Sequence, residues 1–291
     1  MKPSPQAKKP KVDTIKPEII FLGTGGARIV VFKQIRASGG IWVRLEGTEI
    51  HIDPGPGALV HSTSKRLRLD PTHLSAIVLS HKHLDHSADI NVMIEAMTEG
   101  GFQRKGAVFA PRDAYESDPV IFRYVRSYAE AMEVLEEGSQ FQIGGISLQA
   151  PLRLHHPVEN YALTIKGGGK TITLISDTRY FAQLENAPEK EDILILHTVL
   201  LQRREIDHLC LEDAKRIIGA RKPQLAVLTH FGMTMLRAKP WELAAGLEQE
   251  LGLRVTAAYD HMRQDLDSLE TEKKPGRAFD GVPVSFTGRS S

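Results

Sequence analysis

The sequence has little of several features that mark particular classes of protein. It contains one cysteine, Cys210, in 291 residues, which excludes a disulfide framework and a zinc site built on several thiolates. Its 37 basic and 36 acidic side chains nearly balance, whereas a dedicated nucleic-acid binder carries a large basic surplus. No apolar run approaches the roughly 18 residues that span a bilayer. What is left is the composition of an ordinary globular protein.

Both ends of the chain differ from its middle. Residues 1–17 combine several lysines with four prolines and few apolar side chains, a composition that predicts a flexible basic tail. No apolar stretch typical of a secretory signal occurs there, so we expect a cytoplasmic protein. Residues 18–268 are expected to form one domain, and residues 269–291 a second, loosely ordered tail.

Between these tails, short apolar runs alternate with helical stretches. The runs predict strands at residues 19–22, 41–45, 49–52, 76–79, 141–143, 146–148, 161–165, 171–175, 193–196, 225–228 and 254–258. Helices are predicted from about 88 to 97 and from about 211 to 220, and apolar spacing predicts a third helix from Val120 to Glu137. Hairpins mixed with helices favour a layered α/β domain with mixed sheets.

The strongest chemical signal is the segment His-Lys-His-Leu-Asp-His at residues 81–86, directly after a predicted strand. Imidazole and carboxylate groups are usual ligands of Zn, Mn and Fe. Three imidazoles and a carboxylate in six residues are hard to explain by packing. The alternative is a polar surface loop that is rich in histidine.

Three further apolar runs also end in a candidate ligand. His155 and His156 follow one run, Asp177 follows the second and His230 the third. Strands that deliver ligands from their ends to one edge of a sheet build a metal pocket on a rigid scaffold. One histidine after a strand is usually only an edge residue, but the four groups together predict a metal site.

These motifs resemble the metallo-β-lactamase fold superfamily. The segments Leu-Gly-Thr-Gly-Gly at 22–26 and Ile-Asp-Pro-Gly at 52–55 match its early glycine loop and its second-strand aspartate. The resemblance covers about residues 18–262. It implies an α/β fold, the αββα sandwich of two mixed sheets between helical layers, with a dinuclear metal site on the edge between the sheets.

The resemblance also implies roles for individual residues. The first metal would be bound by His81, His83 and His156, the second by Asp85, His86 and His230, and Asp177 would bridge the two. Asp53 would support the metal loop rather than bind metal. The backbone N–H groups of the glycine loop, residues 23–26, are candidates for substrate contacts.

His155 is the rival of His156 as the third histidine. In the phosphodiesterase branch this histidine stands seven residues before an aromatic or apolar residue of the next strand, which follows a glycine. Counting from His156 reaches Leu163, with Ala162 in the place of the glycine. This favours His156 and leaves His155 at the surface or beside the ligands.

The surrounding residues narrow the branch. The Gly-His-Thr type motif usual in class B β-lactamases and glyoxalase II-like thioesterases is missing, and the chain is too short for the β-CASP branch. The chain is therefore most similar to the group of tRNase Z and the phosphodiesterases. tRNase Z itself fits poorly, because its Gly/Pro-rich substrate arm and a strong basic patch for a folded tRNA are missing.

Within this group His208 resembles a proton-donating histidine, and His197 stands in place of the glutamate that orients it. A neutral imidazole holds its partner's charge less well than a carboxylate, although a pair of histidines can still pass a proton. The alternative for His208 is a polar residue at a helix N-terminus, with Asp207 as the cap. Arg36 can clamp a phosphate or be an ordinary surface arginine, and His261 is expected to face solvent.

The resulting hypothesis is a dinuclear metal-dependent hydrolase that acts as a phosphodiesterase. Two divalent ions, Zn first with Mn or Fe as alternatives, would share a bridging hydroxide near Asp85 and Asp177, and His208 would protonate the leaving alkoxide. Alternatives are a hydrolase of a carbon ester, thioester or lactone, a di-iron redox protein, and a non-catalytic metal-binding module. The expected partner is a small phosphate-containing molecule rather than a membrane or a nucleic acid, with a homodimer left open.

Overall fold

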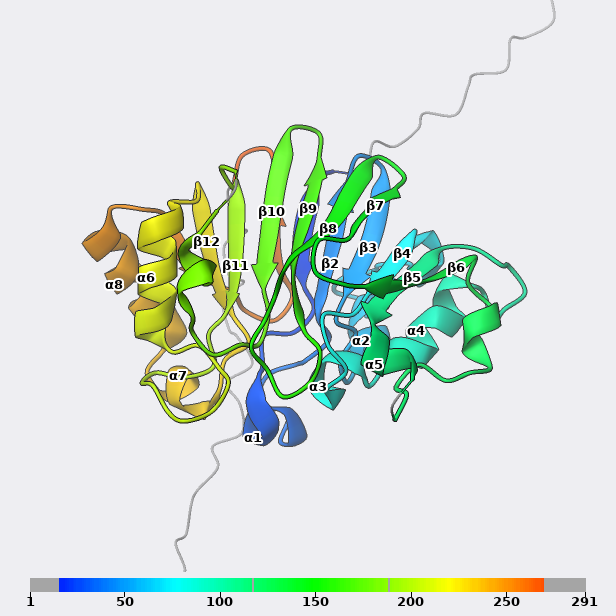
Figure 1. The fold of residues 1–291 in the computed structure, drawn as a ribbon, viewed down its shortest axis with the longest axis horizontal. Helices are drawn as coiled ribbons and strands as arrows, with labels where there is room; N and C mark the ends of the chain where they lie inside the picture. Colours follow the sequence, from blue (N-terminus) through cyan, green and yellow to red (C-terminus); the bar gives the residue numbers. More distant parts are fainter. Residues whose placement is uncertain (1–15, 117, 188, 270–291) are drawn as a thin grey trace, which may run out of the picture.

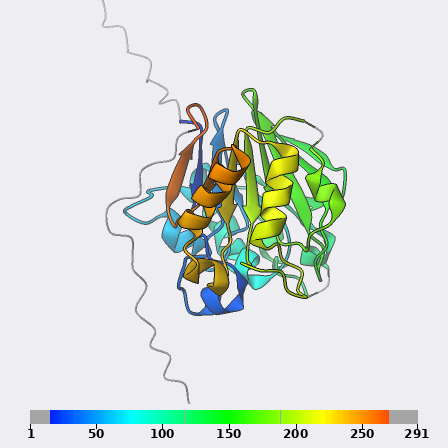
Figure 2. The ribbon, with the colours of Figure 1, turned by 90° about the vertical axis from the view of Figure 1, so that its left-hand side faces the viewer.

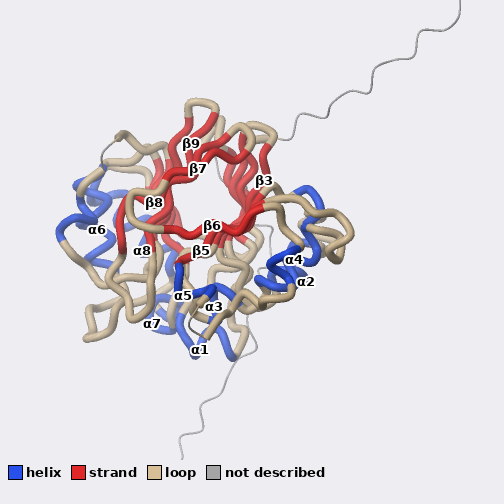
Figure 3. Tube along the Cα trace, turned by 45° about the vertical axis from the view of Figure 1, so that its right-hand side comes forward, coloured by secondary structure: helices blue, strands red, loops and turns tan. Residues whose placement is uncertain are grey.

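The computed structural model describes residues 16–116, 118–187 and 189–269. Within these residues two sheets of seven strands pack face to face, with helices on their outer faces (Figures 1 and 3). The first sheet has the order β14 (Met262–Asp265), β1 (Glu18–Phe21), β2 (Ile41–Leu45), β3 (Thr48–Ile52), β4 (Ala76–Val78), β5 (Ala107–Pro111) and β6 (Ala131–Leu135). The second has the order β13 (Val255–Ala257), β12 (Leu225–Thr229), β11 (Ile193–His197), β10 (Lys170–Ile175), β9 (Tyr161–Gly167), β8 (Ile146–Arg153) and β7 (Gln140–Ile143). The expected layered α/β sandwich is confirmed.

Helices form the two outer layers. On the first sheet these are α2 (Ala58–Ser62) and α4 (Ile90–Met97), and on the second α6 (Leu211–Arg221) and α8 (Pro240–Leu251), which lie side by side in Figure 2. Four short helices, α1 (Ala27–Phe32), α3 (Leu84–Ser87), α5 (Arg112–Tyr115) and α7 (Met233–Arg237), gather at one edge, the lower edge in Figure 1. Single 3₁₀ turns occur at η1 (Pro71–His73), η2 (Val125–Ser127) and η3 (Ala182–Glu185). No helix in these residues is long and apolar enough to cross a membrane.

Strand β1 illustrates why the apolar runs are continuous rather than alternating. Ile19 and Phe21 point into the core between the two sheets, whereas Ile20 packs against the helical layer on the other face. Trp42 of β2 also lies in the outer cluster, while its neighbour Val43 lies in the inner one. Strands covered on both faces need apolar side chains at successive positions.

The helix predicted from Val120 to Glu137 is wrong. This segment contains the single turn η2 and then β6, which pairs in parallel with β5 from Ala107↔Ala131 to Pro111↔Leu135. The apolar side chains of its first half pack on the helical layer, but residues 131–135 satisfy their backbone groups through a strand more than twenty positions away. Local spacing carries no information about such a partner.

The C-terminal part also departs from the prediction. The strand expected to be last is followed by β14, which pairs antiparallel with β1, and helices α7 and α8 were not predicted. Earlier in the chain, strand β5 and helices α1, α2, α3 and α5 were not predicted either. Of the two expected tails, only Lys16, Pro17 and Leu269 fall within the described residues. Lys16 forms an ion pair with Asp265 on β14, so the predicted tail meets the sandwich at residue 16.

The topology brings several strand ends to one edge. Strands β3 and β4 are parallel neighbours in the first sheet, and β10, β11 and β12 are parallel neighbours in the second. Because parallel strands end on the same side, the segments that follow them meet where the two sheets face each other. The predicted metal ligands lie in these segments, except His156, which follows β8.

Candidate metal centre

Three imidazoles form the first group of candidate ligands, at the edge marked by α3 in Figure 1. One ring nitrogen each of His81, His83 and His156 lies within 4.8 Å of the others. His156 Nε2 is 2.9 Å from His83 Nδ1. The other nitrogen of His156, Nδ1, can donate to the carbonyl oxygen of Asp207 at 3.1 Å, and this leaves Nε2 as a bare lone pair directed at the group.

A buried hydroxyl sets the tautomer of His81. Ser80 Oγ donates to Asp53 Oδ2 at 2.6 Å, so it can only accept from His81 Nδ1, which is 3.0 Å away. The proton of His81 therefore sits on Nδ1. The free Nε2 is buried and has no hydrogen-bond partner among the described residues, as expected of a nitrogen that binds a metal ion.

The second group combines two imidazoles with two carboxylates. Asp177 Oδ2 is 3.5 Å from His86 Nε2 and 3.4 Å from His230 Nε2. Asp85 Oδ2 is 3.8 and 3.5 Å from the same two nitrogens. Neither nitrogen has a hydrogen-bond partner in the described part of the chain. The donor atoms of both groups thus fit divalent cations of the Zn, Mn or Fe type.

The two groups differ in protonation. Burial lowers the pKa of His156 to about 4, and burial together with neighbouring imidazoles lowers the pKa values of His81 and His83. Burial also opposes a charge on His230, but the carboxylates of Asp177 and Asp85 raise its pKa to about 9. The pKa of His86 is raised well above its usual range, because Asp85 and Asp53 outweigh its burial. At neutral pH these shifts favour neutral imidazoles in the first group and imidazolium forms of His86 and His230 in the second.

The two groups should therefore release different numbers of protons when ions bind at pH 7. Metal ligation requires neutral imidazole, so filling the second group should displace about two protons and filling the first close to none. Titration calorimetry in buffers of different ionisation enthalpy measures both numbers. Release of equal numbers of protons in the two binding steps would contradict the difference in protonation between the two groups.

The shift of His230 contributes to the pH dependence of stability in the metal-free protein. The folded-state pKa of His230, about 9, lies above its ordinary value of 6.5. Its stabilising contribution is therefore fully present below pH 6.5 and is lost as the pH rises through 9. In the calorimetry above, proton release in the second step should shrink over the same range.

Asp53 holds the loop of the first histidines in place. It follows β3 with a positive φ of 53°, a conformation that aspartate tolerates better than most residues. Its carboxylate accepts from Ser80 N and Ser80 Oγ at 2.6 Å and from His86 Nδ1 at 3.0 Å. The carboxylate thereby directs His86 Nε2 toward the second group, which agrees with the supporting role predicted from the sequence.

The glycine loop supports His230 from behind. His230 has a φ of 58°, and the chain around it is pinned by hydrogen bonds between Phe231 and the backbone of Thr24 and Gly26. A Cβ on Gly26 would lie 2.4 Å from the His230 ring, so only glycine allows this approach. The amides of Thr24, Gly25 and Gly26 all donate to acceptors in the protein, and the expectation that this loop offers N–H groups to the substrate is wrong at these three positions.

His197 and His208 both approach Asp177, from different sides. His197 Nδ1 is 3.1 Å from Asp177 Oδ1, and its ring stacks on His230 with centroids 4.4 Å apart. His208 Nδ1 is 3.5 Å from Asp177 Oδ2. No hydrogen bond, ion pair or ring contact joins His197 to His208 among the described residues. His197 instead holds Oδ1 of Asp177, and one of its ring nitrogens lies within 4.8 Å of ligand atoms of His86, Asp177 and His230.

The alternative interpretation of His208 as part of a helix terminus also fails. The N-cap of α6 is Cys210, whose side chain and backbone N–H pair with Asp213 in a capping box, and Asp207 caps nothing there. His208 stands before the helix with 18% of its side chain exposed, and Asp85 is similarly exposed at 20%. Solvent reaches the second group past these two side chains.

The other predicted residues lie at the margin of the site. His155 stacks on Phe181 with centroids 4.0 Å apart, away from the histidine group that contains His156. Arg36 is half-buried in the loop before β2. His261 does not face solvent as predicted: it is half-buried, and its Nε2 lies 2.8 Å from His61 Nδ1, a pairing between distant segments.

Some residues that support the site were not predicted from the sequence, although each lies within two positions of a predicted ligand. Ser80 and Ser176 each directly precede a candidate ligand, and their hydroxyls meet at 2.9 Å. Arg179, two residues after Asp177, is an exposed cation 4.0 Å from Asp207. The polar residues beside the predicted ligands could have indicated these supporting roles.

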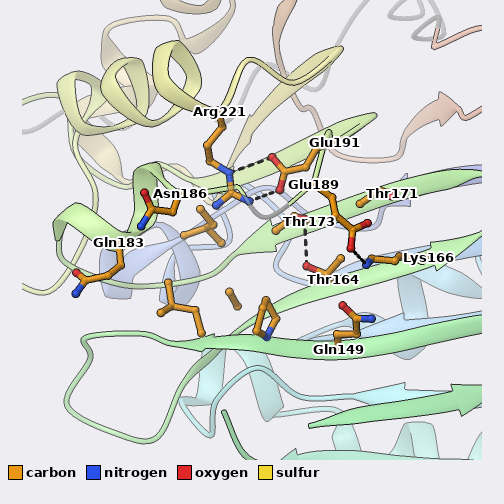
Figure 4. Close-up of a pocket in the computed structure, with 14 residues that line it drawn as sticks. Gln149, Thr164, Lys166, Thr171, Thr173, Gln183, Asn186, Glu189, Glu191 and Arg221 are labelled. Atoms are coloured by element: carbon orange, nitrogen blue, oxygen red, sulfur yellow. Dashed lines mark hydrogen bonds and ion pairs between the residues drawn. The ribbon is translucent and has the colours of Figure 1, made fainter. Parts of the chain in front are cut away.

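A larger hollow lies elsewhere, on the outer face of β8, β9 and β10 (Figure 4). Its volume is about 240 Å³, but it contains none of the candidate ligands. Its charged side chains are paired, Arg221 with Glu191 and Lys166 with Glu189. The chemistry is therefore assigned to the histidine and aspartate groups rather than to this hollow.

Comparison with known proteins gives relatives over most of the chain. The family profile described as "Beta-lactamase superfamily domain" matches residues 48–231. Protein MJ1374 of Methanocaldococcus jannaschii is 30% identical over 83% of this chain and 92% of its own length. The probable metallo-hydrolase YhfI of Bacillus subtilis is 28% identical over 55% of this chain and 68% of its own length.

Solved structures share the same fold. The crystal structure of YhfI superposes with a TM-score of 0.71 at 19% identity, covering 86% of this chain and 99% of that one. A diphosphatase from the PhnP family gives a TM-score of 0.65 at 15% identity, covering 85% of this chain and 97% of that one.

A further sequence relative, Ribonuclease Z of Kineococcus radiotolerans, is more distant. It is 22% identical over 90% of this chain and 98% of its own length, in line with the expectation that the chain is not tRNase Z itself.

Proposed function

The chain belongs to the β-lactamase superfamily and has the metallo-β-lactamase fold, and from this premise we propose that it is a dinuclear metal-dependent hydrolase of a small phosphodiester. The observation that carries the proposal is the convergence of two donor groups beside one carboxylate, that of Asp177. Its Oδ2 faces the second group, and its charge also acts on His81 and His156 of the first. We assign the seven predicted ligands to two ions on this basis, with Zn first and Mn or Fe as alternatives.

Bound divalent ions supply a nucleophile by lowering the pKa of water, and they neutralise charge on phosphoryl oxygens. The protein's own groups hold the site in shape. Ser80 and Asp53 fix the ring orientations of His81 and His86, and His197 holds Oδ1 of Asp177. A constellation whose orientations are set by buried hydrogen bonds needs little rearrangement during reaction.

His208 is suited to protonate the leaving group. It is partly exposed, its Nδ1 is 3.5 Å from Asp177 Oδ2, and its ring is 5.5 Å from that of His156. A group that leaves toward solvent would therefore pass this imidazole. General acid catalysis by a positioned histidine is worth about 10²–10⁴ in rate.

The choice of a phosphodiester rests on charge at the site and on one structural neighbour. Arg36 and Arg179 are cations that can pair with phosphoryl oxygens, and Arg179 lies at the mouth beside Asp207. The neighbour described as a diphosphatase acts on phosphate compounds by its name. The cytoplasmic location and the small-molecule partner stay predictions from the sequence.

Substrate profiling tests this proposal. Protein loaded in turn with Zn and Mn is expected to hydrolyse bis(p-nitrophenyl) phosphate, and protein stripped by a chelator is not. p-Nitrophenyl acetate serves as the carbon ester in the same assay. Protein with two bound ions that cleaves only the carbon ester would overturn the phosphodiester assignment and support the ester alternative.

In this assay, His208→Ala should separate proton donation from a structural effect. We expect a loss of about 10²-fold or more on a diester with an alkyl leaving group. Hydrolysis of bis(p-nitrophenyl) phosphate should change little, since p-nitrophenolate leaves without a proton. His155→Ala is the matched control. Equal losses on both diesters would exclude the acid role.

A further inference from the structure

One buried hydroxyl outside the predicted ligand set faces the second group. Ser38 lies in the loop between α1 and β2 and is 4% exposed. Its Oγ is buried and has no hydrogen-bond partner within the described ranges. Buried hydroxyls are normally paired, either within the protein or with something that the protein binds.

Ser38 lines a narrow cavity that it shares with the second group. Asp85, His86, His197 and His230 line the same cavity, whose volume is about 20 Å³. The two nitrogens without a hydrogen-bond partner, His86 Nε2 and His230 Nε2, belong to residues of this lining. A space of this size admits an ion or a water but no phosphoryl group. The partner that fits beside Ser38 is therefore an ion or a water, and not the substrate.

The fold holds Ser38 against the segment that carries Asp85. The preceding residue, Ala37, donates its N–H to Asp260 Oδ2 at 2.9 Å and accepts from Gly25 N at 2.9 Å. A Cβ on Gly55 would lie 2.0 Å from the carbonyl oxygen of Asp85 and 2.2 Å from that of Ser38. Glycine at 55 thus lets both backbones pack closely, and the position of Ser38 is built in.

We propose that the Ser38 hydroxyl is an additional oxygen donor of the second metal subsite, acting on the ion directly or through one water. This inference rests on the two-ion function proposed above. A neutral oxygen added to two imidazoles and two carboxylates favours a harder ion such as Mn²⁺ in this subsite, whereas the three imidazoles of the first group suit Zn²⁺.

Ser38→Cys gives a spectroscopic test that does not depend on activity. A thiol that meets a metal ion is deprotonated and coordinates it. Titration with Co²⁺ should therefore produce a thiolate-to-cobalt absorption in the near ultraviolet that grows with the second equivalent. Ser62→Cys is the matched control, because Ser62 is equally buried in α2 and bonds to Leu59 instead. Wild-type protein gives the baseline absorption, because its native thiol, Cys210, is present in every variant.

Ser38→Ala covers the case in which a water lies between the hydroxyl and the ion. Calorimetry should then show about tenfold weaker binding of the second Mn²⁺ and unchanged binding of the first, with Ser62→Ala as control. Weaker binding of the second Mn²⁺ by Ser38→Ala, without a cobalt absorption in Ser38→Cys, supports a contact through water. No absorption together with wild-type affinity overturns the inference. Failure of wild-type protein to bind a second ion would instead overturn the two-ion function.

Discussion

Asp177→Ala is expected to abolish metal-dependent hydrolysis of bis(p-nitrophenyl) phosphate, with a loss in kcat/KM of at least about 10³-fold. Asp177 is the carboxylate beside both donor groups, and its side chain is 2% exposed. Its Oδ2 faces His86, His230 and His208, and its Oδ1 faces His197. Alanine removes a ligand and leaves these imidazoles without their shared partner.

Elemental analysis should show fewer than two ions bound per chain in this variant. Asp177→Asn keeps the shape of the side chain without its charge and should show most of the same loss. Asp70→Ala is the matched control, because Asp70 caps η1 at an exposed position and its carboxylate bonds to Thr72 rather than to any candidate ligand. Circular dichroism confirms that each variant is folded. Retained turnover with two bound ions would refute the role assigned to Asp177.

The second large effect is expected on stability. Asp53→Ala should lower the free energy of unfolding of the metal-free protein by about 3–5 kcal/mol, because it removes one partner of a buried charged pair. Asp53 is 4% exposed and accepts three hydrogen bonds, two from Ser80 and one from His86. Alanine also tolerates the positive φ at this position less well.

Urea unfolding of the metal-free protein measures this change. The amide of Asp53→Asn can still accept some of these hydrogen bonds, and asparagine tolerates the backbone conformation. A loss of about 1–3 kcal/mol in the free energy of unfolding is therefore expected. Asp70→Ala removes an exposed cap at η1 and should cost about 1 kcal/mol. If Asp53→Ala were no worse than Asp70→Ala, Asp53 would not be the support of the histidine loop.

The candidate ligands were visible in the sequence because each directly follows an apolar run. A run of apolar residues predicts a strand covered on both faces, and the end of the strand places the next side chain at the edge of the sheet. This reasoning located His81, Asp177 and His230, and the family resemblance then favoured His156 over His155. The structure brings the four side chains to the same edge.

The errors share one physical origin. Residues 131–135 form a strand because β5 offers an unpaired edge, and His261 is half-buried because α2 places His61 beside it. Each outcome depends on a partner far away in the sequence, whose position follows from the packing of the two sheets.

The order of residues therefore specified most of the strands, the chemical types of the donor atoms and the strand ends that carry them. These are local properties, because an apolar run predicts a strand and the polar side chains directly after it predict the ligands. The sandwich then settled which donors face one another, which protons the imidazoles hold and where Ser38 points. Those properties arise from distances between loops of two different sheets, and they exist only after the sheets have packed.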